Sequence, residues 1–153
     1  MIPPLPWLPE GARLPPMRFH HVGVACRDLD AEEARLAPLG YAREGEDFAD
    51  PIQGVRGRFL GGQQPRLELL AEDGTTGVLA PWLQSNVKLY HLAYEVADLD
   101  AALTAATGRA ARGRTVVTPV PAVAFGMRRI AFVLFPTMLL VEFIERPEPS
   151  PDA

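Results

Sequence analysis

The sequence has little cysteine, no long hydrophobic run and no excess of positive charge. Its one cysteine, Cys26, cannot form a disulfide within the chain, which is typical of proteins from the reducing cytoplasm. No apolar stretch approaches the roughly 18 residues that a membrane-spanning helix needs. The formal net charge of −4 argues against binding to nucleic acid or to an anionic membrane surface. We therefore expect a cytoplasmic protein that binds neither nucleic acid nor a membrane.

Proline is unevenly distributed, and most of it lies near the two ends of the chain. Six prolines fall within residues 1–17, and three more follow in the last nine residues. Such segments favour extended conformations and do not pack as helices. We therefore predict a proline-rich arm over 1–17, a single domain over 18–146 and a tail over 147–153.

One sequence segment occurs twice in the chain in similar form. The segment "HHVGVACRDLDA" (20–31) returns as "YHLAYEVADLDA" (90–101), so that His21 corresponds to His91. Later, "RLELLAE" and "LVEFIE" place Glu68 and Glu142 in similar apolar surroundings, in the same order. Two matched features in the same order predict two related modules, 18–73 and 88–146, within the one domain.

Each module shows the same succession of local signals. A short run of β-branched, aromatic and small residues predicts a strand. Asp28 and Asp98 then stand where a helix N-cap belongs, because their carboxylates can accept from the free N–H groups of a first turn. Later in the two halves, "VRGRFLGG", "RLELLAE", "RRIAFVLF" and "MLLVEFIE" are also typical of strands bounded by turns. The fold class predicted is α+β, with two tandem βαβββ modules.

The alternation of side chains along a strand predicts which face of its strand each histidine and glutamate occupies. On a strand, His21 shares its face with Gly23, whereas His20 points the other way. Glu68 lies between Leu67 and Leu69, and Glu142 is flanked in the same manner by apolar residues. A carboxylate inside an apolar strand is costly to bury unless it is paired or binds a metal.

Two such histidines and two such glutamates in repeated modules predict a metal site. Taken singly, a strand histidine is more often a core residue and a strand glutamate more often faces solvent, so the prediction depends on their recurrence together. The predicted ligands are His21, Glu68, His91 and Glu142. Mixed ligation by histidine and carboxylate suits one divalent ion per subunit, with Fe, Mn, Co, Ni, Mg or Zn as candidates.

These motifs resemble those of the vicinal oxygen chelate superfamily, which includes glyoxalase I, bleomycin-resistance proteins, extradiol dioxygenases and methylmalonyl-CoA epimerase. The opening "RFHHVGVACRDLDA", then "LELLAE", "LYHLAYEVADLDAA" and "LVEFIE", are most similar to the epimerase branch. The resemblance covers residues 18–146. It implies a curved mixed sheet that forms a half-barrel cleft around one divalent metal, with helices outside, the same four ligands, and a homodimer.

One position departs from the epimerase pattern. Epimerases of this family commonly carry "EQGV", and its glutamate is taken as one of two proton-transfer bases. This chain has "PIQGV", with Ile52 at the glutamate position and Gln53 matching the next residue. Asp50 is predicted as the substitute base, with Asp47 as the alternative. A further alternative is that no base replaces the glutamate and Ile52 simply fills a pocket.

Further substrate contacts are predicted from the same comparison. Gln53 is a candidate substrate-binding residue. Arg128 and Arg129, in a late loop and strand, are candidates for binding a carboxylate or phosphate; the alternative is a pair of exposed strand arginines.

The function predicted is a metal-dependent epimerase or isomerase. It would move a proton α to the carbonyl of a small oxygenated substrate (an acyl-CoA, a keto-sugar or a cyclitol ketone) through a metal-bound enediolate. Glu142, or Glu68, would act as one base. The alternatives are a glyoxalase-type lyase or a dioxygenase, and a metal-free ligand-binding protein of the resistance kind.

Overall fold

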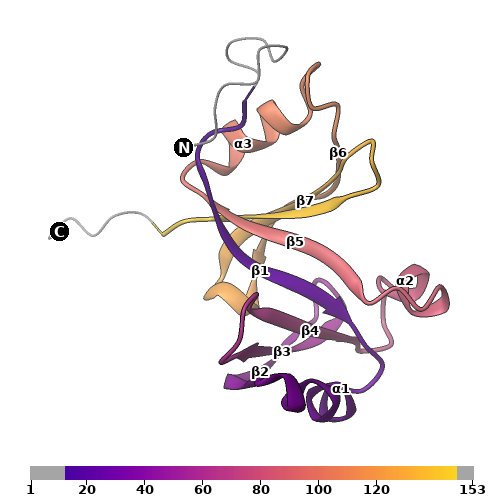
Figure 1. The fold of residues 1–153 in the computed structure, drawn as a ribbon. Helices are drawn as coiled ribbons and strands as arrows, with labels where there is room; N and C mark the ends of the chain where they lie inside the picture. Colours follow the sequence, from indigo (N-terminus) through magenta and orange to yellow (C-terminus); the bar gives the residue numbers. More distant parts are fainter. Residues whose placement is uncertain (1–12, 148–153) are drawn as a thin grey trace, which may run out of the picture. The chain divides into compact units, whose positions relative to one another are not determined.

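The computed structural model describes residues 13–147 and contains two copies of the same succession of elements (Figure 1). The first copy, coloured indigo to magenta, comprises β1 (Met17–Ala25), α1 (Leu29–Leu36), η1 (Ala37–Leu39), β2 (Ala42–Asp50), β3 (Val55–Gly61) and β4 (Leu67–Glu72). A short helix, α2 (Ala80–Gln84), follows. The second copy comprises β5 (Leu89–Val96), α3 (Leu99–Ala106), β6 (Arg114–Ala122), η2 (Val123–Phe125), β7 (Arg128–Leu134) and β8 (Leu140–Glu145).

The strands follow the hydrogen-bonded order β2-β3-β4-β1-β5-β8-β7-β6. β1 and β4 are parallel, whereas β2 with β3, β3 with β4, and β7 with β8 are antiparallel. The predicted α+β class, with a mixed sheet from two βαβββ modules, is confirmed.

The chain divides by its internal contacts into two compact units, which are described separately below. The first unit comprises His20–Ala93 and Ala122–Met127. The second unit comprises Tyr94–Pro121 and the described parts of Met1–Phe19 and Arg128–Ala153. The predicted division into arm, domain and tail stays a prediction, and most of the arm and tail lies outside the described residues.

In the first unit, α1 packs on one face of the sheet. Asp28 caps this helix, because its carboxylate accepts a hydrogen bond from the N–H of Ala31 at 2.8 Å. The cluster beneath α1 combines alternate residues of β1 and β4 with residues of α1, β3 and the adjoining loops: Val22, Val24, Cys26, Leu29, Tyr41, Leu60, Leu67, Leu69 and Ala71. Glu68 therefore lies on the strand face turned away from this cluster.

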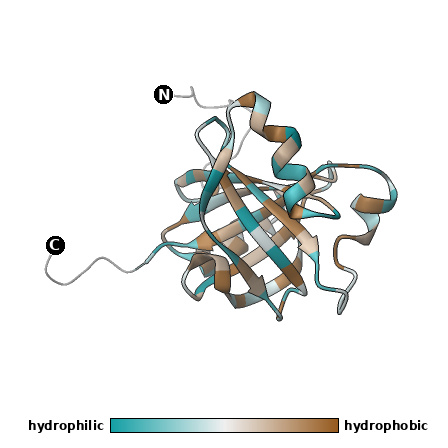
Figure 2. Ribbon diagram, turned by 90° about the horizontal axis from the view of Figure 1, so that it is seen from below, coloured by the Kyte–Doolittle hydropathy of each residue, from teal (hydrophilic) through white to brown (hydrophobic). Residues whose placement is uncertain are grey.

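The second unit repeats this arrangement around α3. Asp98 caps the helix by accepting from the N–H of Ala101 at 2.9 Å. Its core cluster consists of Val96, Leu99, Ala102, Ala106, Ala131, Val133, Val141 and Phe143. Coloured by hydropathy, the strands show hydrophobic and hydrophilic residues in alternation (Figure 2). Within residues 13–147 no helix has the length and apolar character needed to cross a membrane.

Candidate metal centre

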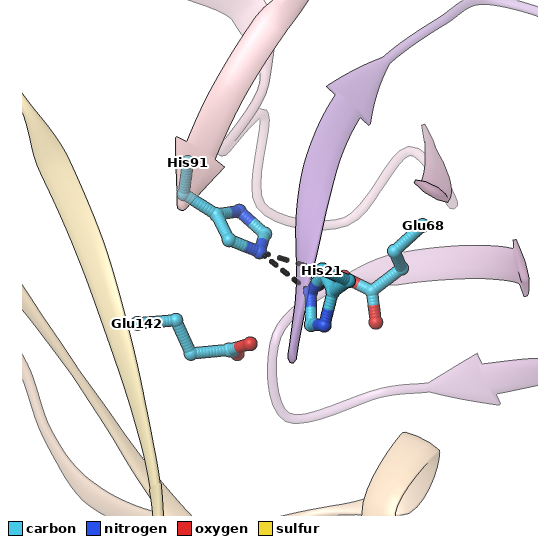
Figure 3. A group of neighbouring side chains, drawn as sticks. All are labelled: His21, Glu68, His91 and Glu142. Carbon is cyan, nitrogen blue, oxygen red and sulfur yellow. Dashed lines mark hydrogen bonds and ion pairs between the residues drawn. The ribbon is translucent and has the colours of Figure 1, made fainter. Parts of the chain in front are cut away.

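Three of the four predicted ligands come together within the first unit. His21 lies on β1, Glu68 on β4 and His91 on β5, and all three side chains are buried (Figure 3). The parallel pairing of β1 with β4 sets Gly23 beside Glu68, which brings the carboxylate to the strand that carries His21.

The ligand atoms of these residues converge on one point. Nε2 of His21 lies 3.1 Å from Nε2 of His91. Oε1 of Glu68 lies 3.4 Å from the first nitrogen and 3.7 Å from the second. A circle through the three atoms has a radius of about 2.0 Å, which is close to the distance at which zinc binds histidine nitrogen and carboxylate oxygen. The donor set therefore fits a divalent ion.

The two histidines are held in the neutral form that a metal requires. Burial, together with the nearby charge of Arg66, lowers the pKa of His21 from 6.5 to about 3. Burial also lowers the pKa of His91 to about 3; the neighbouring His21 adds to this shift and Glu68 opposes it. A neutral imidazole has a lone pair available for a metal at ordinary pH.

Glu68 is the group in this trio that titrates near neutrality. Burial raises its pKa from 4.5 to about 7, and electrostatic interactions with His91, His20 and Arg66 offset part of this rise. A carboxylate buried among neutral groups stays charged only when a cation compensates it. The arrangement therefore favours either a proton or a metal ion at this position.

Two phenylalanine rings pack against the imidazole of His21. Phe125, from the short helix η2, stacks on the imidazole with a centroid separation of 5.7 Å and an angle of 23°. Phe59 of β3 meets the same ring edge-on at 5.5 Å. Gly126 and Met127 follow with positive φ values of 61° and 66°, and the turn they form ends η2. These contacts hold the ring of His21 in one orientation.

His20 lies closer to the site than alternation predicts. Its Nδ1 is 2.8 Å from Nδ1 of His21, and its ring meets Phe125 edge-on at 5.5 Å. Arg66 approaches the other nitrogen of His20 at 3.4 Å. The expectation that the His20 ring is turned away from His21 is therefore wrong: the flexible side chain bends back, where these contacts hold it.

Asp50 and Gln53 form a turn between β2 and β3. The buried Asp50 carboxylate accepts from the backbone N–H groups of Ile52 and Gln53 and from the Gln53 side-chain amide. A fourth hydrogen bond, at 3.2 Å, comes from the backbone N–H of Val123 and ties the turn to η2. These contacts give Asp50 a structural role, while its role as a base and that of Gln53 in substrate binding stay predictions.

Ile52 is exposed, and Asp47 is held by an ion pair. Ile52 is 55% exposed at the tip of the turn, so it does not fill a cavity. Asp47 accepts two hydrogen bonds of 2.7 Å from Arg58, and this interaction lowers the pKa of the carboxyl.

The two arginines predicted to bind substrate are engaged in ion pairs of the second unit. Arg128 contacts the buried carboxylate of Glu95 at 2.9 Å, and Arg18 contacts the other oxygen at 2.8 Å. Arg129 donates two hydrogen bonds to Glu145. Their proposed contact with substrate stays a prediction.

Glu142, the fourth predicted ligand, belongs to the second unit. It is buried on β8. In the sheet register it lies opposite Phe132 of β7, just as Glu68 of β4 lies opposite Phe59 of β3. The two glutamates thus occupy equivalent positions in their modules. Glu142 is also labelled in Figure 3.

Sequence reasoning missed Arg66. Its guanidinium lies 4.3 Å from the centre of the Phe59 ring and close to His20. Arg66 precedes Glu68 by two residues, so strand alternation alone places it on the same face. The alternation in "RLELLAE" is thus the signal that identifies Arg66 as a neighbour of the site.

Comparison with known proteins agrees with this geometry. The model of the Glyoxalase/Bleomycin resistance protein/Dioxygenase superfamily matches residues 20–132. No curated protein sequence matches the chain significantly.

Solved structures with the same fold include two epimerases. Methylmalonyl-CoA epimerase from Mycobacterium tuberculosis is 26% identical, with a TM-score of 0.68, over 88% of this chain and 89% of its own. A variant of the Streptomyces coelicolor methylmalonyl-CoA epimerase, in complex with 2-nitronate-propionyl-CoA, is 26% identical, with a TM-score of 0.69, over 87% and 98%. A hypothetical protein from Bacillus halodurans shares the fold at 22% identity, with a TM-score of 0.70, over 88% and 97%. The resemblance inferred from the sequence is confirmed, and the chain belongs to the Glyoxalase/Bleomycin resistance protein/Dioxygenase superfamily.

Proposed function

We propose that the protein is a metal-dependent epimerase or isomerase that moves a proton next to a carbonyl group. The observation that carries this proposal is the convergence of two neutral histidines and a buried carboxylate around one point. The similarity to two methylmalonyl-CoA epimerases supports the same reaction type.

In this proposal one divalent ion is held by His21, His91 and Glu68, with Glu142 as the fourth ligand. Glu142 is proposed because it repeats the position of Glu68 in the second module and is equally buried. When bound, the ion would polarise a carbonyl oxygen so that a neighbouring proton becomes acidic.

The protein's own groups then position the substrate and move the proton. Phe59 and Phe125 exclude water from one side of His21 and keep its ring fixed. The proposed base that takes the proton is Glu142, with Glu68 as the second choice. Glu68 is second because it already contacts the nitrogens of both histidines. Ile52 has no acid or base to contribute, so the group that returns the proton differs from that of the family pattern.

We propose an acyl-CoA as the first substrate class to test, because the Streptomyces relative was solved with an acyl-CoA analogue. Action as a homodimer in the cytoplasm is proposed by analogy with the family. A metal-free binding protein is the competing proposal, favoured by the missing glutamate at Ile52.

The test measures proton exchange directly. Protein freed of metal and then loaded with Co, Mn or Fe would be incubated in D₂O with candidate thioesters and ketones. Deuterium at the α carbon, observed by NMR, is expected for the wild type and should fall by at least about a hundredfold in His91→Ala, roughly 3 kcal/mol of barrier. The exposed-residue variant Arg56→Gln serves as the matched control and should exchange at the wild-type rate.

A protein that binds less than one metal ion per chain and exchanges no proton would contradict the enzyme proposal. Binding of an intact ligand without exchange, unaffected by metal removal, would instead support the metal-free binding protein.

A further inference from the structure

A cavity of about 220 Å³ lies in the first unit, between α1, α2 and the segment that leads into β5. Strand β1 borders it at Ala25, whose N–H donates to the carbonyl oxygen of Lys88 at 2.9 Å. The lining that the structure describes does not include His21, Glu68 or His91. The cavity is therefore separate from the metal centre.

One face of α1 forms a wall of this cavity. Ala31 and Glu32 precede Arg35 by four and three residues, so the three side chains lie along the same face of the helix. Ala31 contributes only a methyl group to the lining, and so does Ala25. The two alanines therefore leave space that larger side chains would fill.

The acidic side chains of the cavity already have partners. Glu32 accepts a hydrogen bond from Nζ of Lys88 at 2.7 Å, and Asp28 accepts from the N–H of Ala31 at 2.8 Å as the cap of α1. Three cationic and two acidic side chains line the cavity, so one positive charge remains in excess. This balance favours a ligand with a single negative charge.

Two arginines can contact such an anion. Nη2 of Arg27 donates to the carbonyl oxygen of Leu83 in α2 at 3.1 Å, which holds the guanidinium at the cavity. In the part of the chain that the structure describes, neither Arg27 nor the exposed Arg35 forms an ion pair with a carboxylate. Guanidinium groups with donors to spare bind carboxylates well.

Trp82 of α2 supplies an aromatic surface to the same cavity. Its partly buried indole packs edge-on against Tyr90, with 4.6 Å between the ring centres, and this contact restricts its orientation. An apolar cavity of about 150 Å³ in another protein holds one benzene molecule. The larger space found here therefore accommodates one six-membered ring together with an acid group.

We infer that this cavity binds a small monoanion with a single flat ring, of the class of aromatic monocarboxylates. The ring would lie against Trp82, and the carboxylate would face Arg27 and Arg35. The inference involves none of the proposed metal ligands, so it goes beyond the proposed function and does not depend on it.

The experiment titrates the purified full-length protein with benzoate and follows the fluorescence of Trp82. Trp7→Phe leaves Trp82 as the only tryptophan, and calorimetry on the unsubstituted chain measures the affinity independently. Benzoate should cause a saturable change. Acetate, which lacks the ring, and benzylamine, which carries the opposite charge, should each bind at least about tenfold more weakly.

Two variants test the space and the charge separately. Ala31→Leu fills the cavity from an exposed helix position and retains the backbone N–H that Asp28 accepts, so the affinity for benzoate should fall at least about tenfold. Arg35→Gln should weaken binding several-fold and Arg35→Lys less, because lysine keeps the charge. Arg56→Gln, an exposed position on β3, should bind benzoate as the wild type does.

Unchanged benzoate affinity in Ala31→Leu, with the variant folded by circular dichroism, would overturn the inference. The absence of a saturable change in the wild type would do the same. Equal binding of acetate, or tighter binding of benzylamine, would also overturn it, because the cavity would then select no ring or would favour a cation. Proton exchange is not part of these measurements, so its failure in D₂O would contradict the proposed function alone.

Discussion

The imidazole of His91 lies against the backbone of Gly23. A Cβ atom added at Gly23 would lie only 2.2 Å from Cε1 of the ring, closer than real Cβ atoms approach their neighbours. Because Gly23 of β1 has no side chain, the imidazole of His91 on β5 can approach Nε2 of His21.

The first prediction follows from this contact. Gly23→Ala should push the His91 ring out of the trio and lower metal affinity by at least about tenfold, because a displaced ligand no longer converges on the shared point. Isothermal titration with Co²⁺ measures the effect. Gly108→Ala is the control, since an added Cβ there meets only backbone oxygens at 3.4 Å. Equal affinities in the two variants would contradict the assignment of His91 as a ligand.

The second prediction concerns pH. Glu68 has a pKa of about 7 in the metal-free protein, so below that pH it must lose a proton before a metal can bind. Metal affinity should therefore fall as the pH drops below 7, with about one proton released per ion. The histidines add nothing to this slope above pH 4, because the pKa of each is about 3. Calorimetry in buffers of different ionisation enthalpy counts the protons.

Glu68→Gln provides the comparison for this measurement. An amide at the same position has no proton to release, so the number of protons released near pH 6 should fall by about one. The same proton release in this variant would show that another group titrates.

The third prediction separates two roles of Asp50. Its carboxylate accepts four hydrogen bonds, so Asp50→Ala should lower the free energy of unfolding by about 1–3 kcal/mol. Urea unfolding followed by circular dichroism measures the loss. Asp50→Asn retains one acceptor oxygen and should lose less. Loss of proton exchange in the asparagine variant with unchanged stability would instead identify Asp50 as a base.

The fourth prediction tests the buried cation of the first unit. The Arg58 guanidinium is buried and contacts Asp47, Glu33 and Asp30 at 2.6–2.8 Å. Arg58→Ala removes hydrogen bonds to these acids and the buried packing of the guanidinium, and should cost about 1–3 kcal/mol of unfolding free energy because the acids stay accessible to water. Thermal and urea unfolding at pH 7 would measure the loss.

The neighbouring Arg43 is the control for this variant. It shares Glu33 but is 44% exposed, so Arg43→Ala should cost less than about 1 kcal/mol. A similar cost for both variants would indicate that burial does not distinguish the two ion pairs.

Much of the fold could be predicted because repetition and local signals agree. Asp28 and Asp98 cap their helices as expected, and the alternation of Leu67, Glu68 and Leu69 separates core from site. The meeting of His21, Glu68 and His91 also follows from the repeat, since equivalent strands of two related modules carry them.

Other features depend on side-chain conformation, which a pattern of faces does not determine. His20 bends back toward His21 although alternation points it away, and Phe125 reaches His21 from a loop about a hundred residues later in the sequence. The resemblance to the family makes Arg128 and Arg129 candidates for substrate binding, but each has an acidic partner that the linear sequence does not identify.

The segment around Phe125 has a consequence for dividing the chain into its two repeats. It lies in the sequence of the second module, yet by its contacts it belongs to the first unit, as does His91 at the start of β5. A fragment that ended before residue 88 would therefore lack one of the three converging side chains and the ring that stacks on His21.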